Sequence, residues 1–105
     1  MTVHIRTKTG KNLSIAKIVS IITEHKRELL GFGVVELGIF GSFVNGNAKD
    51  NSDIDILVTF NKITFDNYMG LKLFLEGILR RNVDLVIKRT LKPAFNYVVN
   101  EAVYV

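Results

Sequence analysis

Hydrophobic residues recur along this chain with two different periods, and the change of period divides the sequence into elements. Between residues 14 and 30 they recur every three or four positions, which predicts an amphipathic helix with Asn12 or Ser14 as its N-cap. The same spacing between residues 65 and 80 predicts a second long helix, and Pro93 suits the first turn of a last one. The apolar positions assigned to the core are Ile15, Ile18, Val19, Ile22, Leu29 and Leu30 in the first helix and Phe65, Tyr68, Leu71, Phe74, Leu75, Ile78 and Leu79 in the second.

Three apolar stretches between these helices have the pattern of β-strands. A continuous run from Val34 to Phe40 stops at a Gly-Ser pair, as a buried strand does where it enters a tight turn. From residue 53 to residue 60, isoleucine and valine alternate with other residues, and this period of two favours a half-buried strand. A third strand is predicted from Val83 to Ile87.

Two carboxylates lie at alternate positions of the second strand. Asp53 and Asp55 project from one face, about 6.6 Å apart along the backbone, because side chains two residues apart in a strand share a face. Two anions so close repel each other unless a cation such as magnesium lies between or beside them. Asp84 is a third acid in an otherwise apolar strand. Alone it could begin that strand or pair with a neighbouring arginine, but together with the other two it favours a metal site.

The turn before these acids is suited to phosphate. Backbone amides at such a turn point outward, Gly41 lacks a Cβ and lets an anion approach them, and Ser42 adds a hydroxyl donor, particularly if a short helix begins at Phe43. The following loop, residues 45–52, is the segment richest in turn-forming residues. This is typical of a functional loop, although a plain hairpin connection would have the same composition.

A shared metal site also constrains the fold. If Asp53, Asp55 and Asp84 bind the same ions, the second and third strands begin at one edge of the sheet. They are then parallel, and the helix at 65–80 is their crossover in a right-handed βαβ unit. Ser42 must reach that edge from the end of the first strand, so the first strand runs antiparallel to both. We therefore predict an α/β (α+β) fold, a small mixed sheet backed by helices in the order αβαβαβα.

Size and composition limit the possible functions. The 105 residues suffice for one domain, residues 1–105, but not for a separate domain that binds a second substrate. The basic residues behind the net charge of +4 are dispersed, which is typical of a solvated surface, so direct nucleic-acid binding is not expected. Cysteine is absent, which excludes disulfides and thiolate metal sites.

The ends of the chain and its hydropathy indicate where the protein acts. Its start has no apolar secretory core, and no apolar run approaches the roughly 18 residues of a membrane span, so we expect a cytoplasmic protein. Residues 1–12 are polar and basic and are expected to form a terminal arm or a short edge strand, with His4 exposed. The residues leave the oligomeric state and the base of a bound nucleotide open.

The motif around the acids resembles a known family. Gly41-Ser42, followed after ten residues by Asp53-Ile54-Asp55, is similar to the signature of the nucleotidyltransferase superfamily that includes DNA polymerase β. The likeness is greatest to its smallest branch, the minimal nucleotidyltransferases or MNT proteins. The flanking sequences GVVELGIFGSF, NSDIDILVTF, NVDLVIKRTLKP and EAVYV are similar to that branch as well, so the resemblance spans about residues 30–105.

This resemblance implies a fold and a division of roles. The fold would be that of the polymerase β palm. Gly41 and Ser42 would hold the triphosphate of ATP, the donor substrate. Asp53 and Asp55 would be catalytic ligands of two Mg²⁺ ions, and Asp84 would be the third catalytic carboxylate, near the acceptor hydroxyl.

The resemblance also implies a partner. Prokaryotic MNT proteins are commonly antitoxins paired with a HEPN-domain ribonuclease, and some of them transfer AMP to a tyrosine of that toxin. Many relatives carry arginine where this chain has Asn45, and this departure keeps a second hypothesis open, an inactive antitoxin that acts by contact alone. A stand-alone nucleotidyltransferase that modifies RNA or a small molecule is the third, although the chain lacks a domain for such a substrate.

Overall fold

The computed structural model describes residues 13–105, so the predictions for residues 1–12, including His4 and a cap at Asn12, lie outside the described residues. Its elements follow in the order α2 (Ile15–Glu24), α3 (Lys26–Gly31), β1 (Val34–Phe40), α4 (Ser42–Asn45), β2 (Ile54–Phe60), α5 (Phe65–Leu79), β3 (Val83–Ile87), the 3₁₀ turns η1 (Lys88–Thr90) and η2 (Pro93–Phe95), α6 (Tyr97–Glu101) and β4 (Val103–Tyr104). The predicted alternation of helices and strands is confirmed, except that the first helix is divided and a two-residue strand follows the last helix. The prediction for Pro93 is wrong, since this residue begins the 3₁₀ turn η2 and the last helix, α6, begins at Tyr97.

The first helix begins at a predicted cap and is interrupted at a residue that the pattern does not single out. Ser14 caps α2, since its side chain accepts a hydrogen bond from the Lys17 backbone N–H at 3.2 Å. At His25 the backbone leaves the helical region, with φ −113° and ψ 23°, and the Nδ1 of its ring donates to the Ile21 carbonyl oxygen at 2.8 Å. The break changes the face that α3 presents to the core, and the predicted core position Leu30 is 71% exposed.

Four strands form one mixed sheet in the order β3-β2-β1-β4. β1 runs antiparallel to β2 and to β4, while β2 is parallel to β3 with α5 between them in the chain, as predicted. The register pairs Phe40 of β1 with Asp55 of β2, and Asp55 with Asp84 of β3. Three neighbouring strands therefore contribute to one row of side chains, and two members of that row are predicted catalytic acids.

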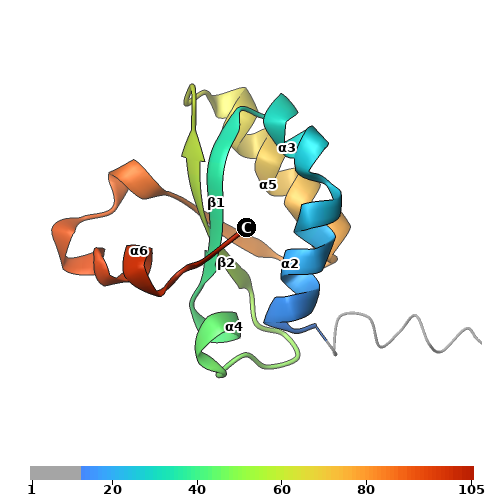
Figure 1. Cartoon of the computed structure of the whole chain (residues 1–105), viewed down its shortest axis with the longest axis vertical. Helices are drawn as coiled ribbons and strands as arrows, with labels where there is room; N and C mark the ends of the chain where they lie inside the picture. The colour runs from blue at the N-terminus through green and yellow to red at the C-terminus, as the bar shows by residue number, and fades with distance from the viewer. Residues whose placement is uncertain (1–12) are drawn as a thin grey trace, which may run out of the picture.

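Helices cover one face of this sheet. Figure 1 shows α2, α3 and α5 on one side of β1 and β2, and α6 with the loop before it on the other. Alternate residues of β2, namely Ile54, Ile56 and Val58, are buried in a cluster with the apolar faces of these helices, and burying each such side chain contributes about 1.5–3 kcal/mol. Leu57 and Val98 are also buried but lie outside that cluster, which indicates that the C-terminal segment covers part of the second face.

Helix α5 packs through leucines and not through the whole predicted apolar stripe. The prediction of a core position at Phe65 is wrong, since this first residue of the helix is 77% exposed; helical spacing does not reveal where the covering elements end. Gly70 admits the Phe32 ring, because a Cβ there would lie 2.8 Å from Phe32 Cε1. No helix in residues 13–105 is long and apolar enough to cross a membrane. The fully buried positions of α5 are Leu71, Leu75 and Leu79.

Candidate active site

The predicted carboxylates lie at the edge of the sheet where β2 and β3 begin. Asp53 directly precedes β2, Asp55 is the second residue of β2, and Asp84 is the second residue of β3. Asp55 and Asp84 are register partners on parallel strands, and they point to the face opposite Ile54 because side chains alternate along a strand. Asp55 is half-buried, whereas Asp53 and Asp84 are exposed.

Asp55 lies in an environment that disfavours its charge. Its pKa is raised above the ordinary value of 3.8, first by burial and then by the negative charges of Asp84 and Asp53. A hydrogen bond between the Asp55 and Asp84 carboxyl groups also favours the protonated form. The backbone N–H of Ser42 donates to Asp55 and lowers the pKa in part, but the net shift is upward. No positively charged side chain is among the causes of this shift at Asp55.

The turn after β1 brings the main chain against Asp55. Gly41 has φ 75° and ψ −146°, a conformation that is nearly confined to glycine. A Cβ at this position would collide with the Asp55 carboxylate and would lie 2.9 Å from its Cγ. Gly41 thus allows the turn and the acid to lie side by side. The Ser42 amide, which we expected to be available to phosphate, is the group that donates to Asp55.

Short-range hydrogen bonds order the loop that links α4 to β2. Ser52 Oγ accepts a bond from the Lys49 backbone N–H at 2.8 Å, and the Ser52 N–H donates to the Lys49 carbonyl oxygen at 3.1 Å. Asn45 Oδ1 accepts a bond from the Asn47 backbone N–H at 3.2 Å, which is an Asx turn. Asn45 is exposed, and its side chain is engaged in this local turn.

One residue beside these elements was not predicted. Arg81 Nη1 donates to the Ser52 carbonyl oxygen at 2.8 Å, and the guanidinium carbon lies 5.5 Å from the centroid of the Phe43 ring. Both partners are far away along the chain. The Arg-Arg-Asn sequence at the end of α5 predicts only a turn, so no local pattern could have indicated these contacts.

The three aspartates have the carboxylate oxygens that a divalent cation binds, but they do not lie close enough together to hold one as they stand. Within residues 13–105, no three histidine, aspartate or glutamate side chains are gathered closely enough to hold a metal ion as they stand. Asp55 and Asp84 share a hydrogen bond, and Asp53 acts on Asp55 through its charge. Carboxylate oxygens are the ligands that Mg²⁺ prefers, and a cation would offset the repulsion that raises the pKa of Asp55.

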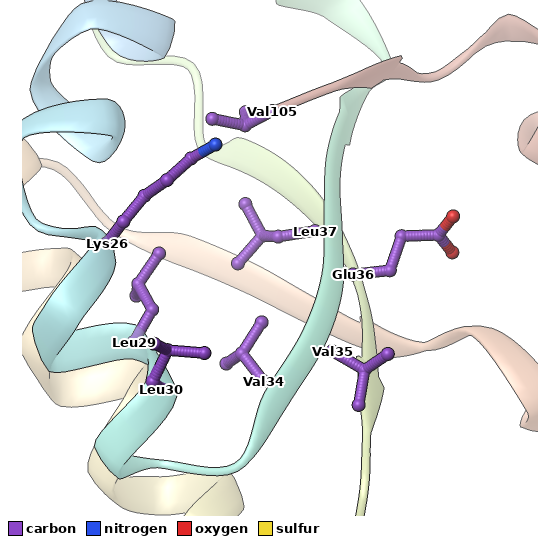
Figure 2. A pocket seen from close by; sticks show the side chains of 8 residues that line it. All are labelled: Lys26, Leu29, Leu30, Val34, Val35, Glu36, Leu37 and Val105. Carbon is purple, nitrogen blue, oxygen red and sulfur yellow. The ribbon is translucent and has the colours of Figure 1, made fainter.

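A pocket of about 170 Å³ lies elsewhere, between α3 and the first half of β1. Figure 2 shows Leu29, Val34 and Leu37 directed into it from the two elements. The acids lie beside Phe40, at the other end of β1. This pocket is therefore not part of the candidate active site.

The family described as nucleotidyltransferase domain matches residues 6–104 of the chain. The chain belongs to this family. It is 47% identical over 96 residues to the protein adenylyltransferase MntA of Thermococcus cleftensis, which covers 89% of this chain and 97% of that protein. The structure of a candidate minimal nucleotidyltransferase is similar with a TM-score of 0.69 and 32% identity over 89% of this chain and 97% of the other. A chain of a toxin–antitoxin structure with AMP-PNP is similar with a TM-score of 0.58 and 28% identity, over 72% of this chain and 64% of that chain.

These similarities confirm the family and the mixed α/β fold that the Gly-Ser turn and the Asp-Ile-Asp motif indicated. As a member of the family the protein is a nucleotidyltransferase.

Proposed function

We propose that this nucleotidyltransferase transfers AMP from ATP, with Mg²⁺, to a tyrosine hydroxyl of a HEPN-domain toxin in the cytoplasm, and so acts as the antitoxin of the pair. Two relatives support the proposal. The Thermococcus protein is named a protein adenylyltransferase, and the 28% identical chain comes from a toxin–antitoxin structure with AMP-PNP.

The observation that carries the proposal is the pairing of Asp55 with Asp84 against the Gly41 turn. Asp53, directly before β2, and Asp55, the second residue of β2, would hold Mg²⁺ together with Asp84 of β3. Mg²⁺, when bound, would activate the acceptor oxygen and neutralise charge on the leaving group.

The phosphate-binding role falls to the turn beside the acids. Gly41 has no side chain that would keep an anion away, and Ser42 can donate through its hydroxyl while its amide remains bonded to Asp55. The triphosphate would thus lie next to the acids without displacing the hydrogen bond that orients Asp55.

The reaction exchanges a phosphoanhydride bond of ATP for a phosphate ester bond to the acceptor. The acceptor oxygen forms a bond to the α-phosphorus, the bond from the α-phosphorus to the bridging oxygen breaks, and pyrophosphate leaves. The hydroxyl proton passes to a base. We assign this role to Asp84, because it is exposed to an acceptor that arrives from solvent and adjoins Asp55.

One observation favours a second candidate, an antitoxin that acts by contact alone. Asn45 supplies no positive charge where many relatives carry arginine, and its side chain is used in a local turn. Triphosphate binding would then rest on Ser42 and the metal ions. The two candidates differ in whether the partner gains mass.

The deciding experiment supplies ATP labelled at the α-phosphate, Mg²⁺ and the product of the neighbouring gene. We expect label on the partner and a matching increase in its intact mass. Asp84→Asn should reduce the transfer rate by on the order of 10² or more, because the acceptor loses its metal ligand or base, while complex formation in size-exclusion chromatography is kept.

The matched control is Asp66→Asn, which neutralises an exposed acid in the first turn of α5. This variant should transfer label at the wild-type rate. A wild-type protein that binds and silences its partner without any mass increase, equally well with and without Asp84, would leave the contact-only antitoxin as the function.

A further inference from the structure

We propose that Arg81 is a positioning residue of the nucleotidyl-transfer site. Its side chain holds the segment before Asp53 and the helix after Gly41 at a fixed separation. This inference rests on the proposed function, because it takes the acids and the Gly41 turn as the site. Arg81 need not contact the nucleotide. It acts through one backbone carbonyl group and one aromatic ring.

Arg81 contacts both halves of the motif from the turn between α5 and β3. Its Nη1 donates to the Ser52 carbonyl oxygen at 2.8 Å, and that carbonyl belongs to the same planar peptide unit as the Asp53 N–H. Its guanidinium lies over the ring of Phe43, 5.5 Å from the centroid. Phe43 is the residue after Ser42 in α4. One side chain therefore links the peptide that precedes a proposed metal ligand to the helix that carries a proposed phosphate ligand.

Both contacts end on groups that are already held in place. Phe43 is 7% exposed and belongs to the main core cluster, and Ser52 exchanges two hydrogen bonds with Lys49. Arg81 is half-buried, so the contacts with Ser52 and Phe43 form in partial isolation from water, where charge-assisted hydrogen bonds and cation–π contacts are stronger. By contacting both groups, Arg81 fixes the distance between α4 and the segment before Asp53. The acids are not yet gathered closely enough to hold a metal ion, so their positions depend on such support.

The chemistry of arginine suits this role better than that of lysine. The guanidinium group is planar, so it can cover a ring with its face while it donates hydrogen bonds from its edge. An ammonium group carries the same charge but concentrates it on one atom, and it cannot reproduce both contacts. Arg81→Lys thus removes the planar group that makes both contacts, while the net charge of the protein stays the same.

The test compares Arg81→Lys with Arg80→Lys. Arg80 is the neighbouring arginine, is exposed, and caps the C-terminus of α5, so its substitution controls for charge and for the local turn. The first readout is Mn²⁺ affinity in the presence of AMP-PNP, measured by electron paramagnetic resonance. The second is the rate of label transfer to the partner as a function of Mg²⁺. Asp55→Asn is included as the variant that removes a ligand.

We expect Arg81→Lys to weaken Mn²⁺ binding by about 10-fold and to raise the Mg²⁺ needed for half-maximal transfer by a similar factor, because substitutions of residues that orient metal ligands commonly have effects of this size. Circular dichroism and partner binding should match the wild type, and Arg80→Lys should match it in every readout. If Arg81→Lys does not fold at the assay temperature, Phe43→Leu carries the test, since it removes the ring below the guanidinium and should produce the same loss of metal affinity.

Two failures can be told apart. If Asp55→Asn abolishes Mn²⁺ binding and transfer but the folded Arg81 or Phe43 variant changes neither, the assignment of Arg81 is wrong and the proposed site stands. If wild-type protein transfers no label and Asp55→Asn leaves Mn²⁺ binding unchanged, the proposed site and the role of Arg81 are both rejected.

Discussion

Two carboxyl groups approach neighbouring residues of β3 in opposite electrostatic surroundings. Asp55 pairs with Asp84, and its pKa is raised by burial and by the negative charges of two neighbouring aspartates. The pKa of Glu76 in α5 is lowered, first by the hydrogen bond from the Lys72 ammonium group at 2.8 Å and then by the Val83 backbone N–H at 3.0 Å. The surroundings of Asp55 therefore disfavour its charged form, whereas those of Glu76 favour its charged form.

This difference is what we expect between an acid that stabilises the fold, Glu76, and an acid of the proposed metal site, Asp55. Glu76 accepts from Val83 while Lys72 donates to the Val83 carbonyl oxygen at 2.8 Å, so the two side chains occupy backbone groups of an edge strand that would otherwise be open to pairing. Asp55 has no such cation among its described contacts, and a carboxyl group in that state gains most from a bound metal. Substitutions at the two acids should therefore affect different properties.

The largest expected effect is the loss of activity in Asp55→Asn. Removing this proposed metal ligand should reduce transfer by about 10³-fold or more, because metal stabilisation of the transition state is worth several kcal/mol. Without metal, the variant should be as stable as the wild type or slightly more so, since repulsion with Asp84 is removed. Label transfer and urea unfolding in a chelating buffer measure the two effects. Glu76→Gln, the control, should keep its activity, and equal activity in both variants would remove Asp55 from the site.

A second substitution disturbs Asp55 without altering it. Gly41→Ala places a methyl group where the Asp55 carboxylate lies, so the acid must move, and a displacement of about 1 Å can cost on the order of 10²-fold in rate. Gly46→Ala is the matched control: Gly46 also has a positive φ, 85°, but a Cβ there would meet nothing within 4 Å. Gly46→Ala should lose about 1–2 kcal/mol of stability, because Gly46 has the left-handed helical conformation, and Gly41→Ala should lose about 1–3 kcal/mol, because its conformation is nearly confined to glycine. Only Gly41→Ala should lose activity, and a similar activity in both would mean that the turn does not position the acid.

The arrangement of strands that brings the acids together was predictable from the sequence. Period-two alternation defines the second strand, and the need for Asp53, Asp55 and Asp84 to share ions decides which strands are parallel. The predicted parallel pairing is confirmed, and it makes two of these acids, Asp55 and Asp84, direct partners. The alternating pattern predicts the same surroundings for Asp53 and Asp55. In the structure only Asp55 is half-buried and hydrogen-bonded to Asp84. Burial depends on the strands on either side, which a single strand does not encode.

Other features were missed because they depend on contacts between distant segments. The position of Arg81 over Phe43 joins residues 38 positions apart, as the sequence numbering shows. β4 has two residues, too few to display a period, and its pairing with Gly38 and Ile39 defines it. Leu30 was assigned to the core because the pattern continues through the helix break at His25. Local periodicity thus predicts elements and faces but not the ends of packed surfaces.

A third prediction concerns the stability that Glu76 contributes. Glu76→Ala removes the acceptor of the Val83 N–H and the partner of Lys72, and we expect a loss of about 1 kcal/mol in the free energy of unfolding. Glu24→Ala, at an exposed acid in the last turn of α2, is the control and should change stability little. Chemical denaturation gives both values. Equal effects in the two variants would show that the contact with β3 adds nothing to stability.

The smallest effect, and the one that separates the two acids most directly, is the dependence of stability on pH in the absence of metal. Because the pKa of folded Glu76 lies below its ordinary value of 4.5, the stability it contributes is complete above that pH and is lost as the pH falls through the folded pKa. Because the pKa of folded Asp55 lies above 3.8, its ionisation opposes folding, so stability declines as the pH rises through that folded pKa. Urea unfolding between about pH 3 and pH 7 in a chelating buffer should show a decline on each side.

Each decline should disappear in the variant of its own acid. Glu76→Gln should flatten the acidic side, and Asp55→Asn should flatten the side toward neutral pH. Mg²⁺ should reverse the second slope in the wild type, because the cation binds the carboxylate and its stabilising effect grows as Asp55 loses its proton. In Asp55→Asn the slope should no longer respond to Mg²⁺ in this way. If the decline toward neutral pH persists unchanged in Asp55→Asn, the repulsion among the acids does not act on Asp55, and the electrostatic contrast between the two carboxyl groups fails.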